Sequence, residues 1–179
     1  EALACFDAIL QRAPRNAPAH WHAGRALLMQ QLFRRALPYL EEAVALLPGK
    51  AAPLYDLAFA LGGAGLTEES AKRYQEVVAL QPDWPHAWSR LGRAQIGLKR
   101  YADAETNLRH ALTLTGFREE TLCNLGLLAK ARVQLDTAVE YFLTAIKTRP
   151  KFAEAWNNLA STLADQNKLD EAEFAYRQS

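Results

Sequence analysis

Residues 85–118 read PHAWSRLGRAQIGLKRYADAETNLRHALTLTGFR, and they hold one full copy of a pattern that recurs along the chain every 34 residues. Within this copy, apolar residues recur at spacings of three and four, as they do on one face of an α-helix. They fall into two runs, which Lys99 and Arg100 separate. We therefore predict two amphipathic helices, at residues 86–98 and 101–114, joined by a short turn.

Several series of residues repeat at this interval in a single phase. A proline ends the second helix, because its ring cannot continue a helix interior, except in the unit where Gly116 takes its place. Small residues stand where two helices must cross closely, and a large apolar residue fills the space between them. The series are Pro14, Pro48, Pro82, Gly116 and Pro150; Gly24, Ala58, Gly92, Gly126 and Ala160; Ala2, Ala36, Ser70, Ala104, Ala138 and Ala172; Phe6, Leu40, Tyr74, Leu108, Phe142 and Tyr176; and Ala23, Leu57, Leu91, Leu125 and Leu159.

This pattern resembles the tetratricopeptide repeat family, over essentially the whole chain. The residues that match the family's signature in two units are Trp88, Leu91, Gly92, Tyr101, Ala104, Leu108 and Ala111, and Trp156, Leu159, Ala160, Leu169, Ala172 and Tyr176. The resemblance implies an all-α fold, an α-solenoid superhelix of 34-residue helix-turn-helix repeats. The chain departs from the family pattern at His20, Thr67 and Gly116.

The register divides the chain into a single array of repeats without a linker. We predict a lone second helix at 1–16, followed by units at 17–50, 51–84, 85–118, 119–152 and 153–179, the last one truncated. Terminal repeats normally need a polar outer face, yet Ala2, Phe6 and Ile9 lack the preceding helix that would cover them. We therefore predict that the chain is a fragment of a longer protein and that its uncovered ends can self-associate.

The composition argues against several classes of protein. Half of the residues are hydrophobic and 23% are charged, which is typical of a packed, soluble structure. The net charge of +1 argues against nucleic-acid binding. No apolar run reaches the roughly 18 residues of a membrane-spanning helix, so we expect no membrane insertion. No targeting segment is recognisable, and a cytoplasmic and a periplasmic location both stay open.

No motif for catalysis or cofactor binding stands out. His20 and His22 lie two residues apart on a helix, so they face different sides and cannot chelate one ion together. Gly62, Gly63 and Gly65 fall at a turn between helices with no preceding strand, unlike a phosphate-binding loop. Cys5 and Cys123 fit no metal or redox spacing. We therefore predict no catalytic residue, no metal and no cofactor, and a protein that is not an enzyme.

The resemblance implies that the first helices of the pairs line a concave groove. The predicted partner-binding residues are Trp21, Arg25, Tyr55, Phe59, Arg90, Arg93, Asn124 and Asn158. The other positions expected along the groove are His22, Leu28, Asp56, Ser89, Ile96, Cys123, Leu127, Lys130, Asn157 and Ser161. Aromatic side chains dominate binding hot spots, and arginines suit carboxylates on a partner. The alternative is that Trp21 and Phe59 pack between neighbouring A helices and that the arginines are merely solvated.

Function is expected to lie in this groove. We predict a scaffold that binds a peptide or protein partner, within a bacterial secretion, export or envelope-assembly system. The alternative is the substrate-recognition region of a larger enzyme, such as a glycosyltransferase similar to O-GlcNAc transferase, whose repeats carry a ladder of asparagines. Asn124 and Asn158 continue such a ladder here, whereas His22, Asp56 and Arg90 interrupt it. The clamp with which some family members hold a chaperone's terminal carboxylate is not expected, because only Arg90 agrees with it.

Overall fold

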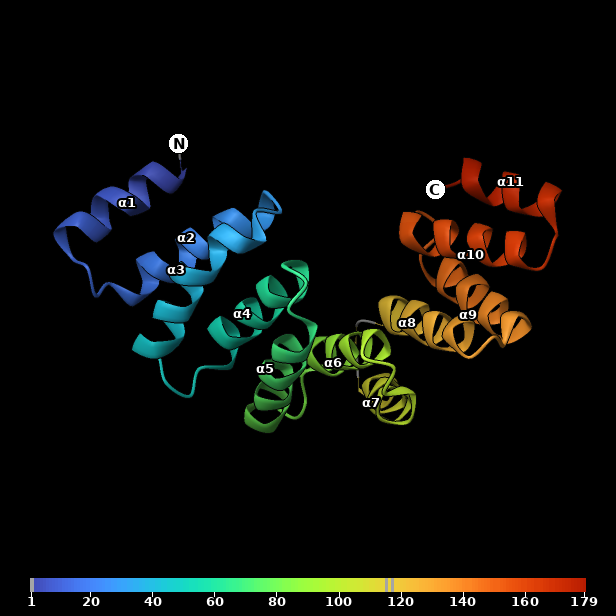
Figure 1. The fold of residues 1–179 in the computed structure, drawn as a ribbon, viewed down its shortest axis with the longest axis horizontal. Coiled ribbons are helices and arrows are strands. Elements are labelled where there is room, and N and C mark those ends of the chain that lie inside the picture. Colours follow the sequence, from blue (N-terminus) through green and yellow to red (C-terminus); the bar gives the residue numbers. More distant parts are fainter. Residues whose placement is uncertain (1, 115, 117) are drawn as a thin grey trace. The chain divides into compact units, whose positions relative to one another are not determined.

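The computed structural model describes residues 2–114, 116 and 118–179. Within these ranges the chain forms eleven α-helices and no strand, which confirms the all-α prediction (Figure 1). The helices are α1 (Ala2–Arg12), α2 (Ala17–Met29), α3 (Phe33–Leu46), α4 (Ala51–Gly63), α5 (Thr67–Leu80), α6 (Pro85–Gly97), α7 (Tyr101–Thr113), α8 (Arg118–Ala131), α9 (Leu135–Thr148), α10 (Ala153–Asp165) and α11 (Leu169–Arg177). The chain divides into two compact units, Glu1–Asp83 and Trp84–Ser179.

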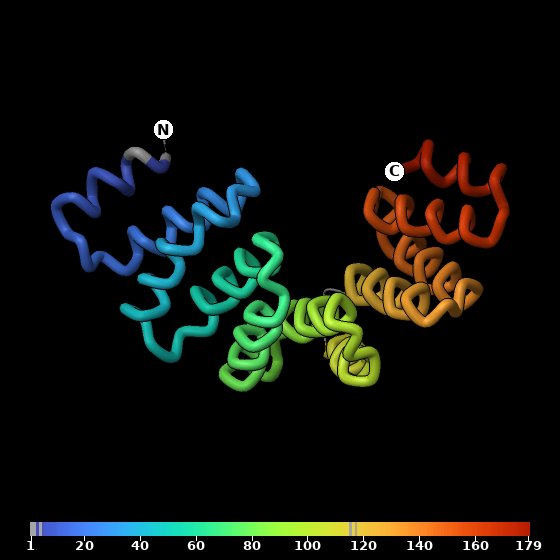
Figure 2. Tube along the Cα trace, in the orientation of Figure 1, coloured from blue at the N-terminus to red at the C-terminus, as the bar shows by residue number. Residues whose placement is uncertain are grey.

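The helices alternate between two roles, as the repeat predicts. We call α2, α4, α6, α8 and α10 the A helices, and α3, α5, α7, α9 and α11 the B helices. Within each unit, every helix packs mainly against its neighbours in the chain, and successive A helices also contact each other (Figure 2). The two helices predicted at 86–98 and 101–114 are observed as α6 and α7, within one residue at each end. Pro85 opens α6, where its fixed φ and missing N–H cost nothing.

The A and B helices of a pair cross closely at glycine. A Cβ atom added to Gly24, Gly92 or Gly126 would lie 2.5 Å from a side-chain carbon of the paired B helix. The atoms that it would meet belong to Leu40, Leu108 and Phe142, the large members of the repeated series. These distances confirm the predicted packing of small against large residues.

The last large member, Tyr176, departs from this packing. It is 48% exposed, whereas Tyr74 at the equivalent place is 3% exposed. The physical reason is that α11 packs mainly against α10, so that one side of the helix stays uncovered.

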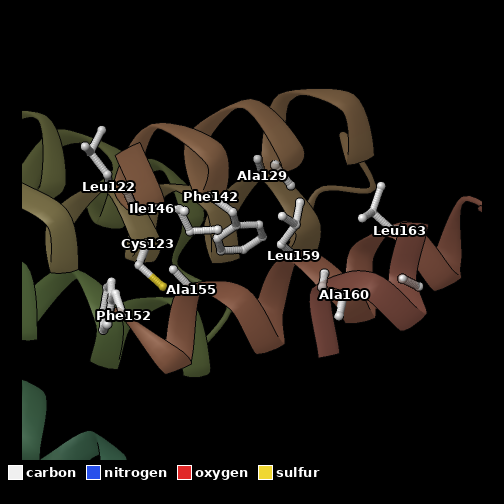
Figure 3. Close-up of a cluster of buried hydrophobic side chains, with 14 residues drawn as sticks. Leu122, Cys123, Ala129, Phe142, Ile146, Phe152, Ala155, Leu159, Ala160 and Leu163 are labelled. Atoms are coloured by element: carbon white, nitrogen blue, oxygen red, sulfur yellow. The ribbon is translucent and has the colours of Figure 1, made fainter. Parts of the chain in front are cut away.

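Each hydrophobic core draws on more than one repeat. In the unit Trp84–Ser179, one cluster joins Leu122 and Cys123 of α8, Phe142 and Ile146 of α9, and Leu159 of α10 (Figure 3). In the other unit, a cluster joins residues of α2, α3 and α4. A repeat therefore completes its core on the next one, as in other repeat proteins.

Candidate interaction surface on the A helices

The predicted binding residues all lie on A helices, but their exposure differs. Arg25 and Arg93 are exposed and Asn124 is buried. The half-buried members are Trp21, Tyr55, Phe59, Arg90 and Asn158. The contacts of these side chains explain why their exposure differs.

Trp21, Arg25 and Asp56 form one cluster between α2 and α4. The indole Nε1 of Trp21 donates a hydrogen bond of 2.7 Å to Oδ2 of Asp56. The Nε atom of Arg25 lies 3.6 Å from the same oxygen, and its guanidinium lies 5.6 Å from the centre of the Trp21 ring. Burial raises the pKa of Asp56, while the Trp21 hydrogen bond and Arg25 act in the opposite direction.

The aromatic rings of α4 pack edge-on against B helices. The ring of Tyr55 lies 5.4 Å from that of Tyr74 on α5, and the ring of Phe59 lies 5.8 Å from that of Phe33 on α3. Trp21 packs against the core cluster of α2, α3 and α4. Phe59 therefore packs against a B helix, and the cluster around Trp21 also includes one, so neither ring packs solely between neighbouring A helices. Each ring keeps part of its surface exposed.

Within each unit, successive A helices are linked at one repeated register. The amide Nδ2 of Asn124 donates to Oγ of Ser89 at 3.0 Å, and Nδ2 of Asn158 lies 3.5 Å from Sγ of Cys123. Both links span 35 residues, as does the bond from Trp21 to Asp56. A polar residue of one A helix therefore reaches back to the A helix of the preceding repeat.

This register corrects the expected place of Ser89, Cys123 and Asn124 in an open groove. Their exposed fractions are 0%, 1% and 5%, because the next A helix covers the first two and Asn124 is the covering side chain. Burial also raises the pKa of the Cys123 thiol to about 11, so the group is neutral at physiological pH.

Cations on three A helices pair with carboxylates of later A helices; Arg25 and Arg93 are exposed, and Lys130 is half-buried. Arg93 Nη1 lies 3.1 Å from Oδ1 of Asn124 and 2.6 Å from Oε1 of Glu154. Lys130 Nζ lies 2.9 Å from Oδ2 of Asp165. Exposed ion pairs of this kind contribute only about 0–1 kcal/mol, so a partner's carboxylate can replace the internal one at low cost.

Sequence reasoning placed Asp56 along the groove without its role as a counterion, and it did not place Glu154 or Asp165 there. Asp56, Glu154 and Asp165 act as counterions for Arg25, Arg93 and Lys130. The signal that could have found two of them is an acidic residue 31 positions after Arg25 and 35 positions after Lys130, spacings close to the repeat length of 34.

Among the residues that the structure describes, no group of three or more His, Cys, Asp or Glu side chains is placed to hold a metal ion. Within the same ranges, no helix has the length and apolar character needed to cross a membrane. His20 is half-buried and His22 is exposed, in line with their predicted orientation toward different sides.

The fold and the repeated register agree with the family comparisons. Models of the tetratricopeptide repeat match residues 1–51 and 123–179, residues 27–89, and residues 85–116. The chain therefore belongs to the tetratricopeptide repeat family, as its sequence pattern predicts.

Individual relatives are more distant. The chain is 31% identical over 104 residues to the BBSome complex member BBS4 of Mus musculus, a match that covers 58% of this chain and 20% of that protein. It is 27% identical over 152 residues to the Hsp70-Hsp90 organizing protein of Triticum aestivum, which covers 84% of this chain and 26% of that protein.

A solved structure shares the arrangement of helices in this chain. The APC/C hetero-tetramer Cut9-Hcn1 matches with a TM-score of 0.85 and 19% identity, over 97% of this chain and 35% of that one. The predicted α-solenoid of helix-turn-helix repeats is thus confirmed. The chain spans between a fifth and about a third of the length of these three proteins.

Proposed function

We propose that this array is a protein-interaction scaffold that binds a peptide or protein segment along its A helices. The observation that carries the proposal is that each of the two compact units presents an exposed arginine on this surface. Arg25 contacts Asp56 and Trp21, and Arg93 contacts Glu154 and Asn124. The side chains of Arg25 and Arg93 are 54% and 45% exposed. Trp21, under the guanidinium of Arg25, adds a half-exposed aromatic ring.

The names of the similar proteins support a role in protein assembly. They are described as a complex member, an organizing protein and part of a hetero-tetramer. We extend this role to the present chain, and we propose that the units 17–50 to 153–179 form one scaffold within a longer protein. A bacterial secretion, export or envelope-assembly system is the setting that we propose for it.

A substrate-recognition region of a glycosyltransferase is the weaker candidate. That reading rested on Asn124 and Asn158 as open members of an asparagine ladder. The amide of Asn124 is buried and occupied by Ser89 and Arg93, which weighs against it.

The chemistry of the surface favours an acidic partner segment with apolar side chains. A partner carboxylate would take the place of Asp56 beside Arg25, or of Glu154 beside Arg93. An apolar side chain would cover the exposed part of Trp21. Charge-assisted bonds from arginine to a carboxylate are the stronger kind of hydrogen bond, and they would set the preference for acidic over basic segments.

Charge reversal tests this proposal. The probes are two fluorescein-labelled twelve-residue peptides that differ only in carrying glutamates or lysines between the same leucines. We expect Arg25→Glu and Arg93→Glu each to weaken binding of the acidic peptide about tenfold, a loss of roughly 1.4 kcal/mol. Fluorescence anisotropy measures the affinity, and circular dichroism checks that the helices persist.

Arg109→Glu is the matched control, because Arg109 is 64% exposed on the B helix α7 and also pairs with a glutamate. It should leave peptide binding unchanged. Equal binding of the two peptides, or an equal effect of Arg109→Glu, would contradict a cationic binding surface on the A helices.

A further inference from the structure

A groove lies between the B helices α9 and α11, with α10 as its floor. Its volume is about 420 Å³. Val139 and Leu143 line it from α9, and Phe174 and Ala175 from α11. The floor consists of Trp156 and of two buried residues. The buried residues are Leu159 and Leu163, which Figure 3 labels.

The other unit holds a groove at the equivalent place, which serves as an internal comparison. That groove lies between α3 and α5 over α4, with a volume of about 300 Å³. Its floor residues Leu57 and Leu61 precede Leu159 and Leu163 by three repeat lengths. The walls differ, because five charged side chains line them: Glu41, Glu69, Lys72, Arg73 and Glu76.

Two wall positions of the α9–α11 groove carry a large apolar side chain that the equivalent positions of earlier repeats lack. Leu143 stands where earlier repeats have Glu41, Gln75 and Arg109. Phe174 stands where earlier repeats have Pro38, Lys72, Thr106 and Glu140, of which only the proline lacks a polar side chain.

These two side chains remain open to solvent. Leu143 is 49% and Phe174 is 61% exposed, and the Phe174 ring lies 6.3 Å from that of Trp156. Single exposed apolar residues are ordinary, but several around one groove mark a binding surface.

The charge of the groove indicates what it binds. Asp170 and Glu171 line it from α11, and within the described ranges neither carboxylate has an ion-pair partner. In the equivalent groove, by contrast, Arg73 lies 3.0 Å from Glu76. An apolar floor beside two carboxylates without counterions is complementary to a segment that carries large apolar side chains and lysine or arginine.

We propose that the α9–α11 groove docks a basic amphipathic segment of a partner protein. Two large apolar side chains of the segment lie against Leu143, Phe174 and Trp156. A lysine or arginine of the segment pairs with Asp170 or Glu171. This surface is formed largely by B helices and is separate from the surface proposed on the A helices, so the chain can hold two segments of opposite charge.

The experiment uses a fluorescein-labelled peptide of fourteen residues with leucines at helical spacing and lysines between them. A second peptide has glutamate in place of each lysine. We expect the basic peptide to bind about tenfold more tightly than the acidic one. On binding, changes in the methyl and indole NMR chemical shifts of the protein should be confined to Val139, Leu143, Leu163 and Trp156.

The variants borrow residues that the chain itself carries at equivalent positions. Leu143→Arg reproduces Arg109, and Phe174→Lys reproduces Lys72. Each should weaken binding of the basic peptide about tenfold, as loss of an apolar anchor does. The double change Asp170→Asn with Glu171→Gln should weaken it several-fold and reduce its dependence on salt. Val133→Lys, at a residue that is 78% exposed outside the groove, is the matched control and should have no effect.

Several results would overturn the proposal. They are equal binding of the two peptides, NMR shifts centred on other helices, and full binding after Leu143→Arg. A concentration-dependent dimer that Leu143→Arg abolishes would overturn it too, because the occupant would then be a second copy of the chain. Should a variant fail to fold, the NMR shifts in the unaltered protein still decide, since they need no substitution.

Discussion

Asp56 is the carboxylate at a repeated position that also holds His22, Arg90, Asn124 and Asn158. The equivalent residues Asn124 and Asn158 bond to the preceding A helix through an uncharged amide. Asp56 accepts its bond as a carboxylate, and burial raises its pKa above the usual value of 3.8. A carboxyl group whose pKa is higher in the folded chain stabilises the fold at a pH below its pKa in the unfolded chain. This contribution is lost as the pH rises through its pKa in the folded chain.

We therefore expect Asp56→Asn to raise the free energy of unfolding at pH 7, by about 0.5 kcal/mol. The amide oxygen can still accept from Trp21, while the partly buried charge is gone. Urea unfolding at pH 7 and at pH 3.5 measures the effect, which should shrink at the lower pH. As a control, Asp56→Ala removes the acceptor and should destabilise. A lower stability of Asp56→Asn at pH 7 would mean that attraction by Arg25 outweighs the cost of burial.

The glycine at the A–B crossing leaves no room for a side chain. Gly126→Ala should lower the free energy of unfolding by about 1–3 kcal/mol, because the new Cβ would lie 2.5 Å from the buried ring of Phe142. The gain in helix propensity, about 1 kcal/mol, does not offset this clash. Thermal unfolding measures the loss. The loss should shrink in a Phe142→Ala background, where the ring is absent; an equal loss there would place its cause elsewhere.

At the scale of an element, the A–B turn has one conformation throughout the array. Its last residue but one has a positive φ in every repeat, at intervals of 34 residues: Gln31, Gly65, Lys99, Val133 and Asn167. Only one of these is glycine, which adopts this conformation without steric cost. A β-branched residue suits it least, so the turn at Val133, with a φ of 62°, is the strained copy.

We expect Val133→Asn, which copies Asn167, to raise the free energy of unfolding by about 1 kcal/mol. Little packing is lost, because Val133 is 78% exposed. The converse change, Gly65→Val, should lower stability by a similar amount although nothing lies within 4 Å of the new Cβ position. Chemical denaturation of both variants checks the pair. If Gly65→Val proves neutral, the turn conformation is not what limits stability.

At the scale of the whole molecule, stability is distributed unevenly because each repeat depends on its neighbours. In the unit Trp84–Ser179, α8 buries eight residues while α11 buries only Ala172 and Ala175. Repeat proteins open in parts according to their local and nearest-neighbour interactions.

We expect native-state hydrogen exchange to be slowest in α8 and fastest in α11, with at least a tenfold difference in protection, equivalent to about 1.4 kcal/mol. Mass spectrometry of peptides from these two helices measures it. Uniform protection along the unit would instead indicate a single cooperative transition, and would contradict the view that neighbouring repeats stabilise each other locally.

The sequence by itself determined the helices, their pairing and the crossing of glycine against a large residue. These features are local or recur at a fixed spacing, so that periodicity reveals them without any knowledge of neighbouring repeats. It also placed Arg25 and Arg93 on the first helix of their pairs.

Only the tertiary structure decided which A-helix residues remain open. Ser89 and Asn124 look like solvent-facing polar residues in the sequence, yet each covers the other, because their separation of 35 residues brings them together when A helices stack. The counterion Glu154 lies 61 residues from Arg93, and the α9–α11 groove draws on three helices. Burial and charge pairing depend on such contacts between repeats, and a pattern read within one repeat does not contain them.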